Sequence, residues 1–129
     1  MLRLAYVDTS ALVALLFREP GADELRERLG QFRRFSSNLL AAELHAAGAR
    51  ETIPPSLTAQ CLAAIEWVFP NRNLEPELGI VLAAGQLRGA DLWHVGCALY
   101  LSELLVPVTF FTRDRRQGEV AAAVGLTVQ

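Results

Sequence analysis

The beginning of the chain constrains the fold most strongly. An apolar run over residues 4–7 ends in Asp8, Thr9 and Ser10, and a second apolar run follows over residues 11–17. This order predicts a buried strand that passes directly into a helix. Ligands of an open parallel sheet bind at the carboxyl ends of its strands. A carboxylate at this place, with further carboxylates later in the chain, is the pattern of a metal site. Because Asp, Thr and Ser are also good N-caps, an ordinary helix start explains the segment equally well.

The rest of the chain alternates predicted strands and helices without a break in composition. Further strands are predicted over 33–37, 107–112 and 126–128, and helices over 23–29, 39–51, 78–87 and 91–101, from 56 to the stop at Pro70, and from Asp114 onward. Such alternation is typical of an α/β/α sandwich with a central parallel sheet. We therefore expect one α/β domain over residues 1–129.

Composition narrows the class of protein. With 52% hydrophobic and 20% charged residues, the chain has the composition of a globular domain. Its longest apolar run is shorter than the roughly 18 residues of a membrane-spanning helix, and no signal peptide precedes Asp8. We therefore expect a cytoplasmic protein that does not enter a membrane. All 12 cationic residues are arginine, which excludes the usual mechanisms of phospho-accepting receivers, haloacid-dehalogenase-like phosphatases and P-loop enzymes, because these need a lysine.

Four of the 14 acidic residues lie where solubility does not require them. Asp8 and Asp114 follow predicted strands, and Asp91 begins a predicted helix. Glu43 has leucine and alanine three and four residues away on either side, which places it on an apolar helix face. A carboxylate there costs several kcal/mol unless it is paired, metal-bound or neutral.

Structural explanations remain open for three of these residues. Asp114 precedes Gln117 by three positions, which is a capping-box pattern. Asp91 is also a plausible N-cap, and Glu43 could pair with an arginine from elsewhere in the fold. The functional explanation is a hard cation, because Mg²⁺ and Mn²⁺ take oxygen ligands and can activate water beside a phosphate. Without a metal, four close carboxylates repel one another, so we expect their pKa values to be raised.

Four segments together carry a family resemblance, namely Tyr6–Leu12, Leu40–Leu44, Arg88–His94 and Phe111–Arg116. In this order and context they resemble the PIN-domain ribonucleases, and specifically the VapC-like toxins of bacterial and archaeal toxin–antitoxin pairs. The segments run nearly from end to end of the chain, and its length also fits. Arg116 departs from the pattern, since some members carry a further acidic residue there that bears on a second metal ion.

The resemblance implies a site and a reaction. Asp8, Glu43, Asp91 and Asp114 would be the catalytic residues that hold Mg²⁺ or Mn²⁺. Thr112, together with Thr9 or Ser10, would hydrogen-bond these carboxylates or a bound water. The implied activity is endonucleolytic cleavage of RNA. The implied partners are the RNA substrate, a second copy of the chain in a homodimer, and a cognate antitoxin whose C-terminal segment blocks the cleft.

Several basic side chains lie close to these acids in the sequence. His94 follows Asp91 by three residues on the same helical side. Three roles fit it, namely a hydrogen-bond partner of the metal-binding carboxylates, a contact to a phosphate, or a histidine that packs in the core. Arg113, Arg115 and Arg116 surround Asp114 at a predicted helix start, where cations are unfavourable. We therefore expect these three arginines to bind RNA phosphates.

Two rival functions fit the same residues. One is a catalytically inactive PIN-fold module that binds RNA or a partner protein, and the other is a metal-dependent nuclease with no antitoxin. The four intact carboxylates argue against an inactive site, because a binding module does not need such costly groups. A small upstream reading frame that encodes a DNA-binding antitoxin would distinguish the toxin from a nuclease of another role.

Overall fold

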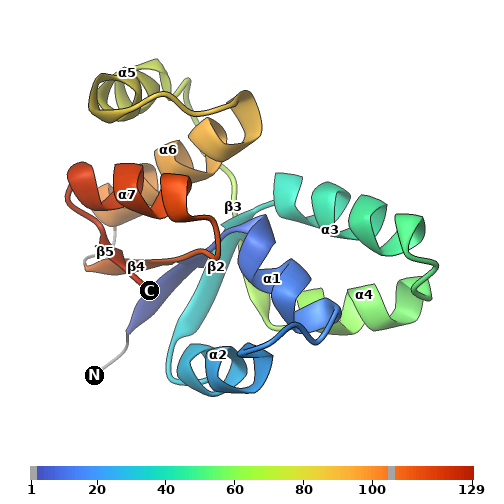
Figure 1. Ribbon diagram of the computed structural model, residues 1–129. Coiled ribbons are helices and arrows are strands. Elements are labelled where there is room, and N and C mark those ends of the chain that lie inside the picture. The colour runs from blue at the N-terminus through green and yellow to red at the C-terminus, as the bar shows by residue number, and fades with distance from the viewer. Residues whose placement is uncertain (1–2, 105–106) are drawn as a thin grey trace.

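The computed structural model describes residues 3–104 and 107–129, and it contains a five-stranded sheet between two layers of helices (Figure 1). The strands are β1 (Leu4–Val7), β2 (Arg33–Ser37), β3 (Ile65–Val68), β4 (Val108–Phe111) and β5 (Thr127–Val128). Their order is β3-β2-β1-β4-β5, and every neighbouring pair is parallel. The predicted α/β class with a central parallel sheet is therefore confirmed, with β1 at its centre.

The helices divide between the two faces of the sheet. They are α1 (Thr9–Leu16), α2 (Ala22–Leu29), α3 (Leu39–Arg50), α4 (Pro55–Leu62), α5 (Glu75–Ala84), α6 (Gly89–Leu104) and α7 (Arg115–Ala123). The first four lie on one side and the last three on the other, as Figure 1 shows. Within the described residues, no helix is long and apolar enough to cross a membrane.

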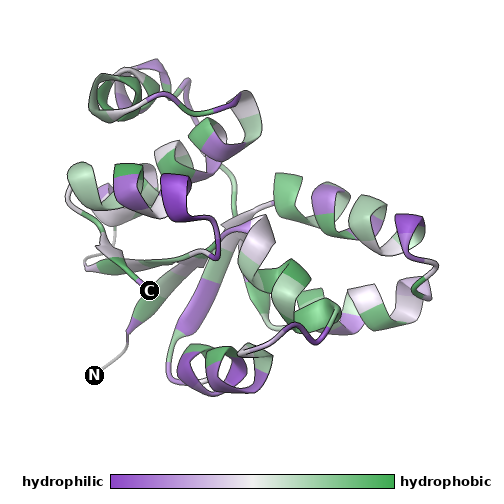
Figure 2. Ribbon diagram, in the orientation of Figure 1, coloured by the Kyte–Doolittle hydropathy of each residue, from purple (hydrophilic) through white to green (hydrophobic). Residues whose placement is uncertain are grey.

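The central strand explains why the core has two halves. Successive side chains of a strand point to opposite faces, and in β1 all four are buried. Leu4 and Tyr6 join the cluster beneath α5–α7, whereas Ala5 and Val7 join the cluster beneath α1–α4. A strand covered on both faces needs a continuous apolar run, and the hydrophobic colouring of β1 in Figure 2 follows from this.

The predicted helix from 56 to Pro70 is wrong in its second half. Helix α4 ends at Leu62, and residues Ile65–Val68 form the edge strand β3 beside β2. Isoleucine, tryptophan and valine suit a strand, and the spacing of Ile65 and Val68 fitted a helix equally well. Cross-strand pairing, which includes an Arg33–Glu66 ion pair of 2.6 Å, decides the outcome.

The chain also leaves α5 earlier than expected, at Ala84 instead of Leu87. A Cβ atom at the next residue, Gly85, would lie 2.7 Å from Cγ2 of Val120 on α7. The chain therefore passes close to α7 at this point, and a larger residue would require Val120 or the backbone to shift.

The sheet topology determines where a ligand can bind. Strand β1 pairs with β2 on one side and with β4 on the other, so the strand order changes direction between β1 and β4. Clefts in open α/β sheets form at the carboxyl ends of the strands at such a switch point. Asp8 follows β1 here, and its backbone N–H donates to the carbonyl of Phe111 at the end of β4 (3.1 Å).

Candidate metal centre

Asp8 is almost fully buried, with 2% of its surface exposed. It is the N-cap of α1, and its carboxylate accepts hydrogen bonds from the Ala11 N–H (3.0 Å), Ser10 Oγ (2.8 Å) and Thr112 Oγ1 (2.6 Å). The pKa of Asp8 is raised above its ordinary value, because the effect of burial outweighs that of the three donors, which lower the pKa. The capping explanation is thus correct for Asp8, but capping alone uses only one of the three donors.

Glu43 lies in the middle of α3 and is 29% exposed. Its Oε1 atom accepts hydrogen bonds from Thr9 Oγ1 (2.6 Å) and His94 Nε2 (2.8 Å). Its partners are therefore a histidine and a threonine, and no arginine pairs with it among the described residues. The donation from His94 is the main reason that the pKa of Glu43 is lowered, although burial opposes it.

Asp91 and Asp114 lie at the starts of α6 and α7, in the helical layer on the other face of the sheet. Asp114 is the N-cap of α7 and accepts a hydrogen bond from the Gln117 N–H (3.0 Å). Asp91 lies in the first turn of α6, which begins at Gly89, so the explanation of Asp91 as an N-cap is wrong. Burial raises the pKa of Asp91, and the charges of Asp114 and Glu43 raise it further.

The effects of charge on the pKa of Asp91 indicate that Asp91, Asp114 and Glu43 lie near one another. The expected rise in pKa occurs at Asp8 and Asp91, where burial is the largest cause. The expectation is wrong for Glu43, because two donors stabilise its charged form. The predicted repulsion between carboxylates contributes to the raised pKa of Asp91, through the charges of Asp114 and Glu43.

The donor set suits a hard divalent cation in its chemistry. The four side chains offer only carboxylate oxygens, which Mg²⁺ and Mn²⁺ prefer, and a cation would relieve the repulsion at Asp91. As the side chains stand, no three Asp, Glu, His or Cys residues of ranges 3–104 and 107–129 converge closely enough to hold an ion. Asp8, Glu43 and Asp114 each accept hydrogen bonds from donors of the chain itself.

Two polar residues of this region were not predicted as site residues from the sequence. Tyr6 lies inside the apolar strand β1, and its hydroxyl is 2.8 Å from Nδ1 of His94. Gln117 is buried, and its Nε2 donates to the backbone carbonyl of Asp91 (3.2 Å) while its Oε1 lies 3.2 Å from Thr112 Oγ1. The capping-box pattern pointed to Gln117, but its side chain connects Asp91 to Thr112 and does not bond the Asp114 backbone.

The three predicted phosphate-binding arginines already have contacts within the protein. Arg113 donates to the carbonyl of Pro20 (2.6 Å), Arg115 pairs with Glu119 (3.0 Å), and Arg116 Nε donates to the carbonyl of Gln86 (3.4 Å). All three arginines are nevertheless exposed to solvent.

Arg88 was missed as a basic residue of this region. Its carbonyl accepts from the Leu92 N–H (2.8 Å), so it occupies the N-cap position of α6, where arginine gives no side-chain cap. Its charge lowers the pKa of Asp91, and its guanidinium makes no hydrogen bond or ion pair with the part of the chain that the structure describes. The signal in the sequence was a cation three residues before Asp91.

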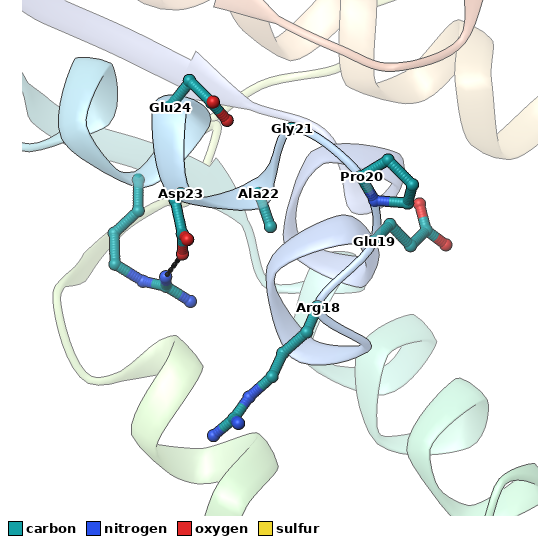
Figure 3. Close-up of a pocket in the computed structure, with 8 residues that line it drawn as sticks. Arg18, Glu19, Pro20, Gly21, Ala22, Asp23 and Glu24 are labelled. Atoms are coloured by element: carbon teal, nitrogen blue, oxygen red, sulfur yellow. Dashed lines mark hydrogen bonds and ion pairs between the residues drawn. The ribbon is translucent and has the colours of Figure 1, made fainter.

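Two surface depressions lie near these residues. A pocket of about 560 Å³ beside the α1–α2 loop is lined by residues 18–24 and Arg26 (Figure 3). Its charges are mixed, Asp23 already pairs with Arg26, and none of the four acids lines it. A groove of about 450 Å³ runs along α7 and is lined in part by Thr112, Asp114 and Arg115. The second groove therefore adjoins the candidate site.

Comparison with known families identifies the class of protein. The PIN-domain profile matches residues 5–123, and the chain therefore belongs to the PIN-domain family. The resemblance noted in the sequence is confirmed at this level. A comparison with curated proteins gave no match.

Two solved structures share the fold. VapBC-1 from nontypeable Haemophilus influenzae has a TM-score of 0.70 and 17% identity, with 98% of this chain and 96% of that chain covered. PAE2754 from Pyrobaculum aerophilum has a TM-score of 0.62 and 20% identity, with 99% of this chain and 92% of that chain covered. At these identities the likeness establishes the common fold.

Proposed function

We propose that this PIN-domain protein is a Mg²⁺- or Mn²⁺-dependent endoribonuclease that acts as the toxin of a VapBC-type toxin–antitoxin pair. The observation that carries the proposal is the set of acids at the switch point of the sheet. Burial raises the pKa of Asp91, and the charges of Asp114 and Glu43 raise it further, while Asp8 is buried at the end of the central strand. A purely structural role gives no reason to place these carboxylates so close to one another.

In the proposed site, Asp8, Glu43, Asp91 and Asp114 hold the cation. When bound, the ion supplies positive charge for the scissile phosphate and acidifies a water molecule. Ser10 and Thr112 donate hydrogen bonds to the carboxylate of Asp8. Thr9 and His94 donate to the carboxylate of Glu43. Such anchoring fixes the direction of each ligand before the cation arrives.

The neighbouring arginines would bind the RNA backbone. Arg115 lines the groove beside Asp114, and its side chain is 95% exposed. Arg88 lies on the other side, next to Asp91, and its exposed guanidinium is available for a phosphate. Arg113 and Arg116 have backbone carbonyls as partners, so they can reach a phosphate only through their remaining N–H groups.

The proposed activity is tested by incubating the purified chain with mixed RNA in Mg²⁺, in Mn²⁺ and in EDTA. We expect internal cleavage that needs one of the two metals and stops in EDTA. Cleavage that continues unchanged in EDTA would overturn the metal dependence. If no condition gives cleavage while RNA still binds, the rival function of an inactive RNA-binding module takes the place of this proposal.

The toxin role has a separate test. VapBC-1, which shares the fold, motivates a cognate antitoxin as partner. We expect a small upstream reading frame for a DNA-binding protein whose product co-purifies with this chain and suppresses its cleavage of RNA. If there is none, a nuclease without an antitoxin is the better assignment. A homodimer, which the family resemblance implies, is part of the proposal and can be checked by light scattering.

A further inference from the structure

A continuous hydrogen-bonded chain connects the sheet backbone to the carboxylate of Glu43. The Ser37 N–H donates to Tyr6 Oη (3.1 Å), Tyr6 Oη lies 2.8 Å from His94 Nδ1, and His94 Nε2 lies 2.8 Å from Glu43 Oε1. Tyr6 has no exposed surface and His94 has 1%. Polar groups buried this deeply are costly unless each has its partner, and here each one does.

The proton positions in this chain follow from the chemistry of its two ends. A carboxylate only accepts, so the proton on the Glu43 side belongs to His94 Nε2. In the neutral imidazole, Nδ1 is then an acceptor, and the Tyr6 hydroxyl supplies its donor. The phenol of Tyr6 is a hydroxyl donor at neutral pH, and it lies fully inside the protein. Tyr6 thus selects the tautomer in which His94 donates to Glu43.

Both donors to Glu43 meet on the same oxygen. Thr9 Oγ1 (2.6 Å) and His94 Nε2 (2.8 Å) bond Oε1, while Oε2 has no hydrogen-bond partner within residues 3–104 and 107–129. A carboxylate held by one oxygen cannot rotate freely, and its second oxygen has a defined direction. A fold that needed only to bury this corner of the sheet would be served as well by apolar side chains.

We propose that His94 and Tyr6 are positioning residues, which anchor Oε1 of Glu43 so that Oε2 is presented to a divalent cation. This inference rests on the proposed metal site and adds to it a supporting chain that reaches back into the core. Tyr6 and His94 act through Glu43 and do not touch the substrate.

The test is the affinity of the purified chain for Mn²⁺, measured by calorimetric titration. His94→Leu removes the donor, and we expect a loss of about 10–100-fold, the usual cost of a lost outer-shell partner. His94→Gln can place an amide N–H near the position of Nε2, and we expect it to remain within a few-fold of the wild type. Tyr6→Phe keeps the ring stacked on Phe110 but removes the hydroxyl, and we expect an intermediate loss.

Tyr100→Phe is the matched control. Tyr100 is also nearly buried, and its hydroxyl bonds Asn71 outside this site, so its loss should leave Mn²⁺ affinity unchanged. Thermal unfolding of each variant shows whether it is folded, and Tyr6→Phe and His94→Gln keep the test valid if His94→Leu does not fold.

The possible failures are distinct. If the wild type binds no Mn²⁺, the proposed metal site itself is wrong. If the wild type binds and both His94→Leu and Tyr6→Phe match its affinity, the positioning role is wrong while the metal site stands. Equal losses in His94→Gln and His94→Leu would overturn the assignment of the Nε2–H donor, because packing of the ring would then be the cause.

Discussion

The carboxylate of Asp8 shows how one residue serves the fold and the site in opposite ways. As an N-cap it stabilises α1 by bonding the Ala11 N–H. As a buried anion it destabilises the folded state, because burial raises its pKa above the ordinary value of 3.8. Because the pKa of this acid is higher in the folded state, the protein becomes less stable as the pH rises from the ordinary pKa to the folded pKa. Above the folded pKa the full destabilisation is present.

Asp8→Asn should therefore separate stability from function. Asparagine caps a helix as well as aspartate does, and it carries no charge. At pH 7 we expect the variant to unfold at a temperature higher by on the order of 1–5 °C, with the difference disappearing as the wild-type Asp8 becomes protonated in acid. Cleavage of RNA should fall by more than about 100-fold, since even outer-shell changes cost 10–100-fold. A lower melting temperature at pH 7 together with full activity would contradict both roles.

Arg88 gives a second prediction at the residue scale. Arg88→Gln should weaken RNA binding measured by fluorescence anisotropy and reduce the slope of log affinity against log salt by about 1. Arg28→Gln is the control, because Arg28 is also exposed but lies on α2. Identical salt slopes for wild type and Arg88→Gln would exclude a phosphate contact at Arg88.

The candidate residues differ in how far the sequence could reveal them. Asp8 and Asp114, with Thr9, Ser10 and Thr112 beside them, stand out at the ends of apolar runs, and Glu43 stands out as a charge on an apolar helix face. Tyr6 does not stand out, because a tyrosine in a strand is ordinary and its partner His94 is 88 residues away. Such pairs become visible only when the fold brings the two segments together.

At the scale of elements, local patterns were sufficient wherever a single period dominated. Strands β1, β2, β4 and β5 were predicted close to their observed bounds, and so were α2 and α3. Strand β3 was missed because Ile65 and Val68 are spaced by three, which suits a helix face as well as a short strand. Pairing with β2 decided between the two, and pairing is a tertiary effect that no local window contains.

Contacts between helices are testable through two glycines inside helices. A Cβ atom on Gly48 of α3 would lie 2.9 Å from Oγ1 of buried Thr58 on α4, whereas one on Gly79 of α5 would meet nothing within 4 Å. Alanine favours a helix over glycine by roughly 0.5–1 kcal/mol. In urea unfolding we expect Gly79→Ala to raise the free energy of unfolding by roughly 0.5–1 kcal/mol. Gly48→Ala should be less stable than Gly79→Ala by roughly 1–3 kcal/mol, which is the cost of overpacking. Equal gains in both variants would show that α3 and α4 are not in close contact there.

At the scale of the whole molecule, topology assembles the site. Asp8, Glu43, Asp91 and Asp114 come from four separate segments, and the parallel order with β1 at the centre brings them to one edge of the sheet. Their spacing in the sequence predicted a shared edge but no distances. Strand order depends on how two helical layers cover both faces at once, and the orientation of each carboxylate depends on donors contributed by other elements.

We propose that these four carboxylates form one metal-dependent catalytic site for RNA. The most direct test of this proposal is single-turnover cleavage of one RNA in Mn²⁺ by the wild type, Asp91→Asn and Asp23→Asn. Asp23 is the control because it is exposed on α2 and, among the residues that the structure describes, pairs with Arg26 alone. We expect Asp91→Asn to cleave more slowly by more than about 100-fold and Asp23→Asn to cleave at the wild-type rate. A wild-type rate for folded Asp91→Asn would show that Asp91 is not part of the catalytic site.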